Sequence, residues 1–486
     1  MKHINKFRTL FIFIVMMTGL SSCKKWLDVS PQTQVKEEEQ FSSTQGFYDA
    51  LFGMYQKAAD PNLYGAVLSY DLLDILAQRY ESKSSTNTSF GRITRYDYAG
   101  DDISRVKITN IWISMYATIA QCNFILKNAD NGVLKDADYR IVKGEALGMR
   151  AFMHFDLLRC FALAYLDGAN AAQPGIPYMD KFTVTRQDQL TVDAVLKKCE
   201  EDLKAAETLL AGSMDNNPGA LNPKIDNPDL QFRQNHLNYW AVKAALARLY
   251  LYKGMKAEAL SYAKDVINAG KFGFVNPASL VVDPSSSLAD MNFASEHIFS
   301  IYTSGLKKRT DDVFVASTPN APDAYDLFST LPKLNAMYET TQAGYGTDIR
   351  SPSSVKPLWY QLFPAVVYTR KLSFDNATNT NASVVPVIRL SEMYYIAAEA
   401  SETLHDGITW LNVVRKARQI PVLPDPSTSA ALQVEIEKEH RKEFYAEGQL
   451  WFYYKRTNKQ VIPDGTGVVM LPSTYVFPYP AVELSY

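Results

Sequence analysis

Five glutamates near the C-terminal end could, by their number, supply catalytic carboxylates. Paired carboxylates can act as a general acid and a general base, the arrangement that hydrolyses glycosidic bonds. Here the glutamates alternate with Lys438, Arg441 and Lys442 in a stretch with helical periodicity, where opposite charges three or four residues apart attract each other. The pattern therefore favours ion pairs along one long helix over a catalytic pair. The five residues are Glu435, Glu437, Glu439, Glu443 and Glu447.

No other pattern in the sequence indicates catalysis or metal binding. There is no GxSxG, HExxH, Walker or GxGxxG motif. Asp97, Asp101 and Asp102 have ligand atoms suited to calcium, but they lack the residue order and the glycine of an EF-hand, which favours a solvated acidic loop. His154 lies in an aromatic, helical stretch, where a core or capping role is expected. We therefore predict no catalytic residue, no metal and no cofactor.

The N-terminal segment has the layout of an export signal. Three cations, the last of them Arg8, precede an uncharged apolar run from Leu10 to Met17, which is too short to span a bilayer permanently. The following Leu20-Ser21-Ser22-Cys23 resembles a bacterial lipobox, in which a signal peptidase cuts before a lipid-modified cysteine. We predict a signal peptide over residues 1–22, a lipid anchor on Cys23 and one exported domain over residues 23–486.

Charge and composition restrict the class of ligand. The chain of 486 residues has 50 Lys and Arg against 52 Asp and Glu. Removal of residues 1–22 would leave 47 against 52, a formal charge of −5, so nothing indicates a nucleic-acid partner. Aromatic residues make up 12%, with 29 tyrosines, whose apolar rings and polar tips suit wet binding surfaces.

Three cysteines remain after Cys23, and they form no CxxC motif or Cys/His cluster. Cys122, Cys160 and Cys199 each lie among helix-forming residues, which favours buried thiols. A Cys122–Cys160 disulfide is the alternative in an oxidising compartment.

Helical periodicity dominates the chain and predicts a mainly α fold. Ala247, Tyr250, Gly254, Ala259 and Ala263 have the small, aromatic and turn positions of a tetratricopeptide-type helical pair. No regular 34-residue repeat runs through the chain, so the array is expected to be irregular. The expected helices are Phe41–Ala59, Ile108–Asn128, Tyr139–Ala164, Val192–Leu210, Asn238–Tyr252, Lys256–Ala269, Leu390–Leu404, Thr409–Arg418 and Ala430–Arg456.

Two long insertions, at about residues 81–102 and 272–380, interrupt the helices. They are rich in Gly, Pro, Ser, Thr and Asn and contain several aromatic residues. Short strands are expected at Ile298–Tyr302 and Val366–Thr369. Loops on a rigid helical base are a common way to build a binding face, although such rings can also pin the loops to the core.

Several short motifs, in order along nearly the whole chain, resemble the SusD/RagB family of Bacteroidetes surface lipoproteins. No single motif is sufficient, but together with the lipobox the similarity is strong. Leu450 and Tyr453 stand where the family usually has Arg and Asp, which suggests an exchanged ion pair. The motifs are Cys23–Pro31; Phe47, Ala50, Gly53 and Tyr55; Gly144–Ala146 with Arg150–Phe152 and Phe155–Arg159; Ile388–Tyr394; Ala397–Ala400; Leu411-Asn412 with Val414-Arg415; and Glu439–Phe444 with Glu447-Gly448 and Trp451-Phe452.

The resemblance implies a SusD-like binder that is not an enzyme. It would sit on the extracellular face of the outer membrane, capture a glycan and deliver it to a SusC-like TonB-dependent transporter. Asp74 and Arg79 fall near a family position for polar ligand contacts. Loop placement adds Tyr96, Tyr98, Tyr302 and Trp359 as ring contacts, whereas Trp112 and Trp451 are assigned to the core. A peptide-uptake binder of the same fold is the second hypothesis, and a lipid-anchored hydrolase is the third.

Overall fold

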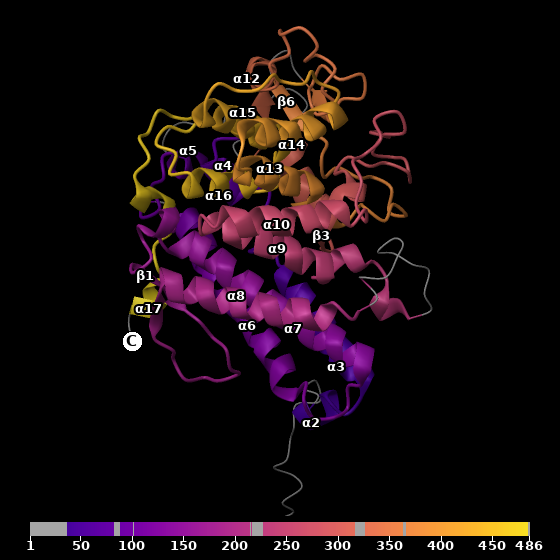
Figure 1. The fold of residues 1–486 in the computed structure, drawn as a ribbon, viewed down its shortest axis with the longest axis vertical. Coiled ribbons are helices and arrows are strands. Elements are labelled where there is room, and N and C mark those ends of the chain that lie inside the picture. Colours follow the sequence, from indigo (N-terminus) through magenta and orange to yellow (C-terminus); the bar gives the residue numbers. More distant parts are fainter. Residues whose placement is uncertain are drawn as a thin grey trace, which may run out of the picture.

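The computed structural model describes residues 36–81, 88–100, 102–213, 215, 227–315, 326–362 and 366–484. The signal segment and Cys23 lie outside these residues. The described chain is mainly helical, with consecutive helices stacked as antiparallel neighbours (Figure 1). The longer helices are α3 (Thr44–Ala58), α6 (Asp102–Asn128), α7 (Asp136–Phe161), α8 (Val192–Leu210), α9 (Tyr239–Tyr252), α10 (Lys256–Asn268), α13 (Leu390–Ala400), α14 (Leu404–Ala417) and α15 (Ser429–Glu443).

Shorter elements fill the ends and the insertions. The short helices are α2 (Glu37–Gln40), α4 (Leu72–Leu76), α5 (Ser89–Ile93), α11 (Leu306–Phe314), α12 (Leu331–Met337), α16 (Gln449–Arg456) and α17 (Ala481–Leu484). The strands are β1 (Pro174–Pro177), β2 (Gln189–Thr191), β3 (His297–Tyr302), β4 (Ser329–Thr330), β5 (Trp359–Gln361), β6 (Val366–Thr369) and β7 (Val384–Arg389). They form antiparallel sheets in the orders β1-β2, β3-β7 and β4-β6-β5. Both strands expected from the sequence are therefore confirmed, as β3 and β6.

The helical pair expected at residues 239–268 is confirmed as α9 and α10. Asn238 begins α9 by accepting hydrogen bonds from the backbone N–H groups of Trp240 and Ala241. Small residues let the two helices approach closely, and nearly every side chain of α9 is buried. Gly254 makes the turn with a φ of +74°, and a Cβ there would lie 2.1 Å from Oδ1 of Asp167.

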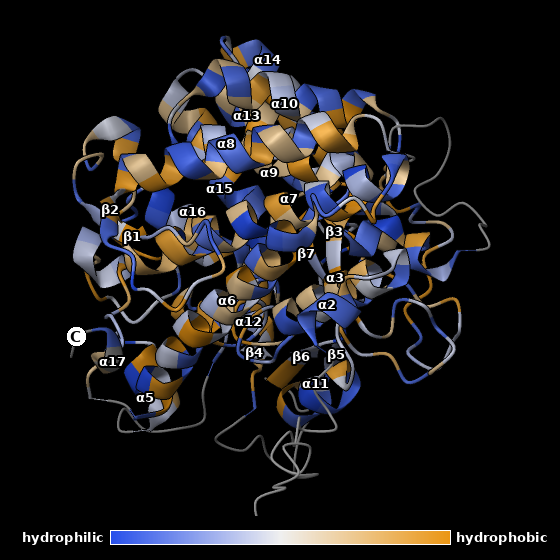
Figure 2. Ribbon diagram, turned by 90° about the horizontal axis from the view of Figure 1, so that it is seen from below, coloured by the Kyte–Doolittle hydropathy of each residue, from blue (hydrophilic) through white to orange (hydrophobic). Residues whose placement is uncertain are grey.

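Colouring by hydropathy shows hydrophobic and hydrophilic residues mixed along most helices (Figure 2), as expected for helices that bury one face. In the part of the chain that the structure describes, no helix is both long enough and apolar enough to cross a membrane. Trp112 and Trp451 are buried, which confirms their assignment to the core. His154 is also buried, and it contacts the carbonyl oxygen of Arg150 and the N–H group of Met179.

The three described cysteines are free and fully buried, which confirms the thiol prediction over a Cys122–Cys160 disulfide. Burial raises the pKa of Cys122, Cys160 and Cys199 above the ordinary value. These thiols therefore serve as packing groups.

The prediction of one long helix over residues 430–456, with the glutamates paired along its surface, is wrong. The helix breaks between α15 and α16, where Ala446 and Gly448 have positive φ values of 60° and 70°. Buried Asp74 from α4 accepts hydrogen bonds from the N–H groups of both residues, at 2.6 and 3.0 Å. A carboxylate from a distant segment thus fixes this turn.

Three of the five glutamates belong instead to a buried ionic network. Arg389 contacts Glu443 at 2.5 Å, Arg415 contacts Glu439 at 2.7 Å, and neither arginine is exposed. The network joins α15 to β7, α14 and the segments that carry Glu296 and Arg350. Because each charge contacts at least one opposite charge, and Glu443 contacts three arginines, the cost of removing these charges from water is offset locally. The members are Glu296, Asp348, Arg350, Lys371, Arg389, Arg415, Arg418, Glu439, Lys442, Glu443 and Glu447.

A buried lysine holds the closing segment of the chain against α7. Nζ of Lys455 donates hydrogen bonds to the carbonyl oxygens of Arg159 and Tyr475, and the N–H group of Phe477 donates to the carbonyl of Cys160 at 3.0 Å. Burial lowers the pKa of Lys455 to about 7. The neutral amine still has enough N–H groups for both carbonyl acceptors.

Substitution of Lys455 by methionine should change how stability depends on pH. Between about pH 7 and the ordinary lysine pKa of 10.5, the unfolded chain binds a proton at Lys455 that the folded chain does not. The free energy of unfolding contributed by this residue therefore rises with pH across that window. Urea denaturation at pH 7 and pH 9 should show the wild type gaining stability relative to K455M. An equal pH response of the two proteins would contradict the assigned pKa.

Candidate functional site

A cleft of about 890 Å³ lies on one side of the helical array. Four segments form it: the C-terminal half of α3, the segment 228–236, the stretch from the end of β3 to Arg309 in α11, and the loop 374–383. The helices and strand can be located in Figure 2. We refer to this hollow as the cleft. Its size suits a ligand of several sugar rings or a short peptide.

Three aromatic side chains line the cleft and remain open to solvent. Phe52 is 59% exposed, Phe232 is 44% exposed and Tyr302 is 56% exposed. Most other aromatic side chains of the described chain are buried or packed against the core. Large rings left exposed in a concave surface are unusual and indicate a contact site for a ligand.

Phe232 has a strained backbone as well as an exposed ring. Its φ and ψ of 51° and 47° lie in the left-handed region, which a bulky residue rarely adopts. Such strain costs on the order of 1–3 kcal/mol and is concentrated at functional sites. The neighbours hold it in place, since Arg233 is fully buried and pairs with Asp215 at 2.8 Å. The fold therefore sustains an unfavourable conformation that places a ring at the cleft.

The polar lining of the cleft is rich in hydrogen-bonding groups and nearly neutral. Three carboxylates, of Asp60, Asp229 and Asp375, stand against the two cations Lys307 and Arg309. Amide and hydroxyl groups complete the lining. They belong to Gln56, Gln231, Asn235, Thr303, Ser304, Thr378, Asn379, Thr380 and Ser383.

Both cations of the cleft have partners in the protein. Lys307 contacts Asp311 at 2.6 Å and Asp375 at 2.8 Å. The guanidinium of Arg309 donates to the carbonyl oxygens of Gly65 and Ser304 and to the hydroxyl of Thr303. Stacking on rings and hydrogen bonding to uncharged groups are therefore the chemistry that this lining offers.

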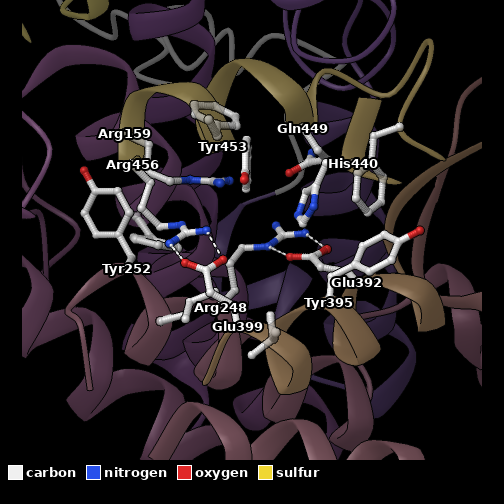
Figure 3. A pocket seen from close by; sticks show the side chains of 15 residues that line it. Arg159, Arg248, Tyr252, Glu392, Tyr395, Glu399, His440, Gln449, Tyr453 and Arg456 are labelled. Carbon is white, nitrogen blue, oxygen red and sulfur yellow. Dashed lines mark hydrogen bonds and ion pairs between the residues drawn. The ribbon is translucent and has the colours of Figure 1, made fainter. Parts of the chain in front are cut away.

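A second, smaller cavity of about 50 Å³ lies between α7, α9, α13, α15 and α16 (Figure 3). Arg248 pairs bidentately with Glu392 at 2.6 and 2.7 Å, and Arg456 pairs with Glu399 at 2.7 Å through both nitrogens. Burial lowers the pKa of His440 to about 4, so this ring is neutral near pH 7. The cavity has room for a few water molecules but not for a sugar.

Of the predicted site residues, Tyr302 lies in the cleft. The structure places Asp74, Arg79 and Trp359 in the core. Asp74 holds the turn before α16. Arg79 donates to the carbonyl of Arg441 at 2.6 Å and stacks on Tyr445, and Nε1 of Trp359 donates to the carbonyl of Arg350 at 2.7 Å.

The two loop tyrosines of the predicted set also lie away from the cleft. Tyr96 is half-buried and stacks on Trp451 with 5.9 Å between ring centroids. Tyr98 is buried and donates a hydrogen bond to the carbonyl of Thr474 at 3.0 Å. Only Tyr302 of the six is therefore retained in the candidate site, because the other five use their polar atoms and faces for packing.

Sequence reasoning missed Phe52, Phe232 and His236. Phe52 had a readable signal, since it falls outside the helical spacing of the buried residues Leu51, Met54 and Tyr55 on α3. Phe232 and His236 lie in a polar connector without periodicity, and nothing local indicates that it borders a cleft. Among the described residues, no group of His, Cys, Asp and Glu is arranged to hold a metal ion.

A helical array with one large side cleft, exposed rings and a nearly neutral lining defines a ligand-binding protein. Comparison with known proteins gives its family. Residues 25–251 match the family described as "Starch-binding associating with outer membrane", and residues 300–469 match the SusD family. The chain belongs to the SusD family.

Individual relatives agree with this assignment. SusD-like protein P38 of Formosa agariphila is 23% identical, covering 95% of this chain and 93% of its own length. A SusD-like carbohydrate-binding protein from Bacteroides vulgatus superposes with a TM-score of 0.68 at 18% identity, covering 91% of this chain and 96% of its own. A laminarin-binding SusD-like protein has a TM-score of 0.60 at 17% identity, with 91% and 97% covered. The mainly α SusD-like fold expected from the sequence is confirmed.

At family level, SusD-like proteins bind carbohydrate, are not enzymes and are associated with the outer membrane.

Proposed function

We propose that this protein binds an oligosaccharide in the cleft and presents it to a TonB-dependent transporter. The observation that carries the proposal is the presence of three solvent-exposed rings, Phe52, Phe232 and Tyr302, in one cleft. The apolar C–H faces of sugars pack against aromatic rings, and the amide and hydroxyl groups of the lining suit sugar hydroxyls. The carbohydrate-binding character of the family supports the same class of ligand.

The proposal includes delivery at the cell surface without a chemical step. A lipid on Cys23 would tether the domain to the outer membrane, and a SusC-like transporter would receive the ligand. A binder of this kind needs only a difference in ligand affinity between two states of the complex. The absence of a catalytic pair among the motifs of the sequence is consistent with this role.

Truncation of the exposed rings should weaken ligand binding while the fold stays intact. We expect Tyr302→Ala and Phe232→Ala each to reduce affinity by at least about fivefold, because large rings at the centre of a contact site contribute about 1 kcal/mol or more. Neither ring is a core residue, so the temperature of unfolding should change little. Isothermal titration with β-1,3- and α-1,4-linked glucose hexasaccharides measures the effect.

Phe182→Ala is the matched control, since Phe182 is 49% exposed and does not line the cleft. It should leave affinity unchanged. Wild-type protein that binds peptides but none of the hexasaccharides would contradict the glycan proposal and favour the peptide-binding alternative. In that case the slight excess of carboxylates in the cleft would provide the contacts for the peptide. Release of shorter sugars during the titration would instead revive the hydrolase hypothesis.

A further inference from the structure

A buried series of polar contacts ends at His236, which lines the cleft. Arg233 contacts Oε1 of Glu145 at 2.5 Å, and both side chains are inaccessible to solvent. The other oxygen of Glu145, Oε2, lies 2.6 Å from the hydroxyl of Tyr55 and 3.1 Å from Nδ1 of His236. The contacts join α7, α3 and the segment that precedes α9.

Glu145 is ionised at neutral pH and can only accept hydrogen bonds. Burial alone would raise its pKa, but the charge of Arg233 and the hydrogen bonds from His236 and Tyr55 outweigh burial and lower the pKa to about 2. The Tyr55 hydroxyl therefore donates to Glu145, and it accepts the N–H group of Leu237 at 2.8 Å. Nδ1 of His236 must likewise carry a proton that it donates to the carboxylate.

The position of this proton determines whether Nε2 of His236 donates or accepts a hydrogen bond. In a neutral imidazole with the proton on Nδ1, the second nitrogen, Nε2, has a lone pair and accepts hydrogen bonds. The side chain is 21% exposed and lines the cleft, and its ring packs edge-on against Tyr55 at 4.9 Å. Within the described part of the chain, Nε2 has no hydrogen-bond partner. The fold thus holds a fixed acceptor in the lining of the cleft.

We propose that Nε2 of His236 accepts a hydrogen bond from an unsubstituted sugar hydroxyl, so that the cleft selects neutral, free-hydroxyl glycans over O-substituted or anionic ones. This inference rests on the proposed glycan-binding function and names the chemistry of its ligand. An ether or ester oxygen has no proton to donate, so a substituted position would leave Nε2 unpaired.

The charges of the cleft support the same selection. Asp60, Asp229 and Asp375 add further acceptors, which suit a ligand rich in hydroxyl donors. An anionic sugar would face Asp60 and Asp229, since Asp375 is paired with Lys307, while Lys307 and Arg309 are already engaged with protein groups. Like charges in a cleft oppose association.

Two substitutions distinguish the roles of the two ring nitrogens. The amide of His236→Asn can reach the position of Nδ1 and donate to Glu145, but it places nothing at Nε2. The longer His236→Gln can place a carbonyl oxygen near Nε2. We expect H236N to weaken binding of the neutral glucose hexasaccharides by about threefold to tenfold, the size of one hydrogen bond, and H236Q to retain more affinity. Hexasaccharides with O-methylated hydroxyls should bind the wild type less tightly and should lose less affinity in H236N.

A ligand-free measurement tests the acceptor directly. The ¹⁵N spectrum of the His236 ring should show a protonated Nδ1 and an unprotonated Nε2, and the opposite tautomer would overturn the proposal. Unchanged affinity in H236N, in protein that binds hexasaccharides, would overturn this inference alone. Failure of the wild type to bind any hexasaccharide would overturn the proposed glycan-binding function and this inference together.

Discussion

Replacement of Glu443 by glutamine is expected to lower the free energy of unfolding by about 3–5 kcal/mol, the usual cost of removing one charge from a buried ion pair. Glu443 is the centre of the ionic network. Its oxygens lie 2.5 Å from Arg389, 2.6 Å from Arg418 and 2.8 Å from Arg350. Glutamine keeps one acceptor oxygen but turns an NH₂ group toward guanidinium groups, which leaves buried positive charge without compensation. Urea denaturation of the two proteins at pH 7 measures the loss.

The effect of E443Q should also depend on pH. Burial would raise the pKa of Glu443, but Arg418, Arg389 and Arg350 hold it well below the ordinary value of 4.5. A lowered carboxyl pKa contributes stability above that ordinary value and loses it as the pH falls further. The difference between wild type and E443Q should therefore shrink under acid conditions.

Glu435→Gln is the matched control, since Glu435 lies on the same helix and pairs with Lys438 at 2.9 Å near the surface. Such pairs contribute about 0–1 kcal/mol. An equal loss of unfolding free energy in E435Q and E443Q would show that the buried network stabilises the fold no more than a surface ion pair does.

Gly448→Ala is expected to cost about 2–5 kcal/mol of folding stability. The φ of +70° costs an L-residue about 1–2 kcal/mol. A Cβ at this position would also lie 2.2 Å from the carbonyl oxygen of Leu68 and 2.9 Å from that of Ser69. Backbone atoms must move to relieve these contacts, and overpacking of this kind costs about 1–3 kcal/mol. Thermal and urea denaturation measure the sum.

Gly270→Ala separates strain from the steric clash. Gly270 has a φ of +61°, and a Cβ there would meet nothing within 4 Å. We expect this variant to lose only the conformational part, about 1–2 kcal/mol. If G448A and G270A lost the same stability relative to the wild type, the close approach of the α16 turn to Leu68 would not contribute to the cost.

The helical scaffold could be predicted because its signal is local. Apolar spacing on α9 and α10, and Gly254 between them, define a helical pair within thirty positions of one another. The ionic network could not be predicted because its partners are distant. Arg418 contacts Glu296, which lies 122 residues earlier in the chain, and only the folded arrangement brings them together. From the sequence, the same glutamates look like the charged surface of one helix.

The candidate site could be predicted only in part, because a loop aromatic shows its type and not its exposure. Tyr302 and Trp359 belong to the same insertion, yet Tyr302 faces the cleft and Trp359 is buried against Tyr445. Trp359 is buried by strand pairing with β6 and by the ring of Tyr445, which lies in the turn after α15. Tyr445 lies far from Trp359 in the sequence, so nothing near Trp359 in the sequence indicates this contact.

Burial of the three thiols limits when they can be oxidised. Disulfide formation requires an accessible thiolate, and Cys122, Cys160 and Cys199 offer neither access nor a lowered pKa while the domain is folded. Oxidants and disulfide-forming enzymes can therefore reach these sulfur atoms only before folding is complete or when the domain opens. The packed helices therefore shield the three thiols, and their oxidation is limited to the interval before the domain folds or to times when it opens.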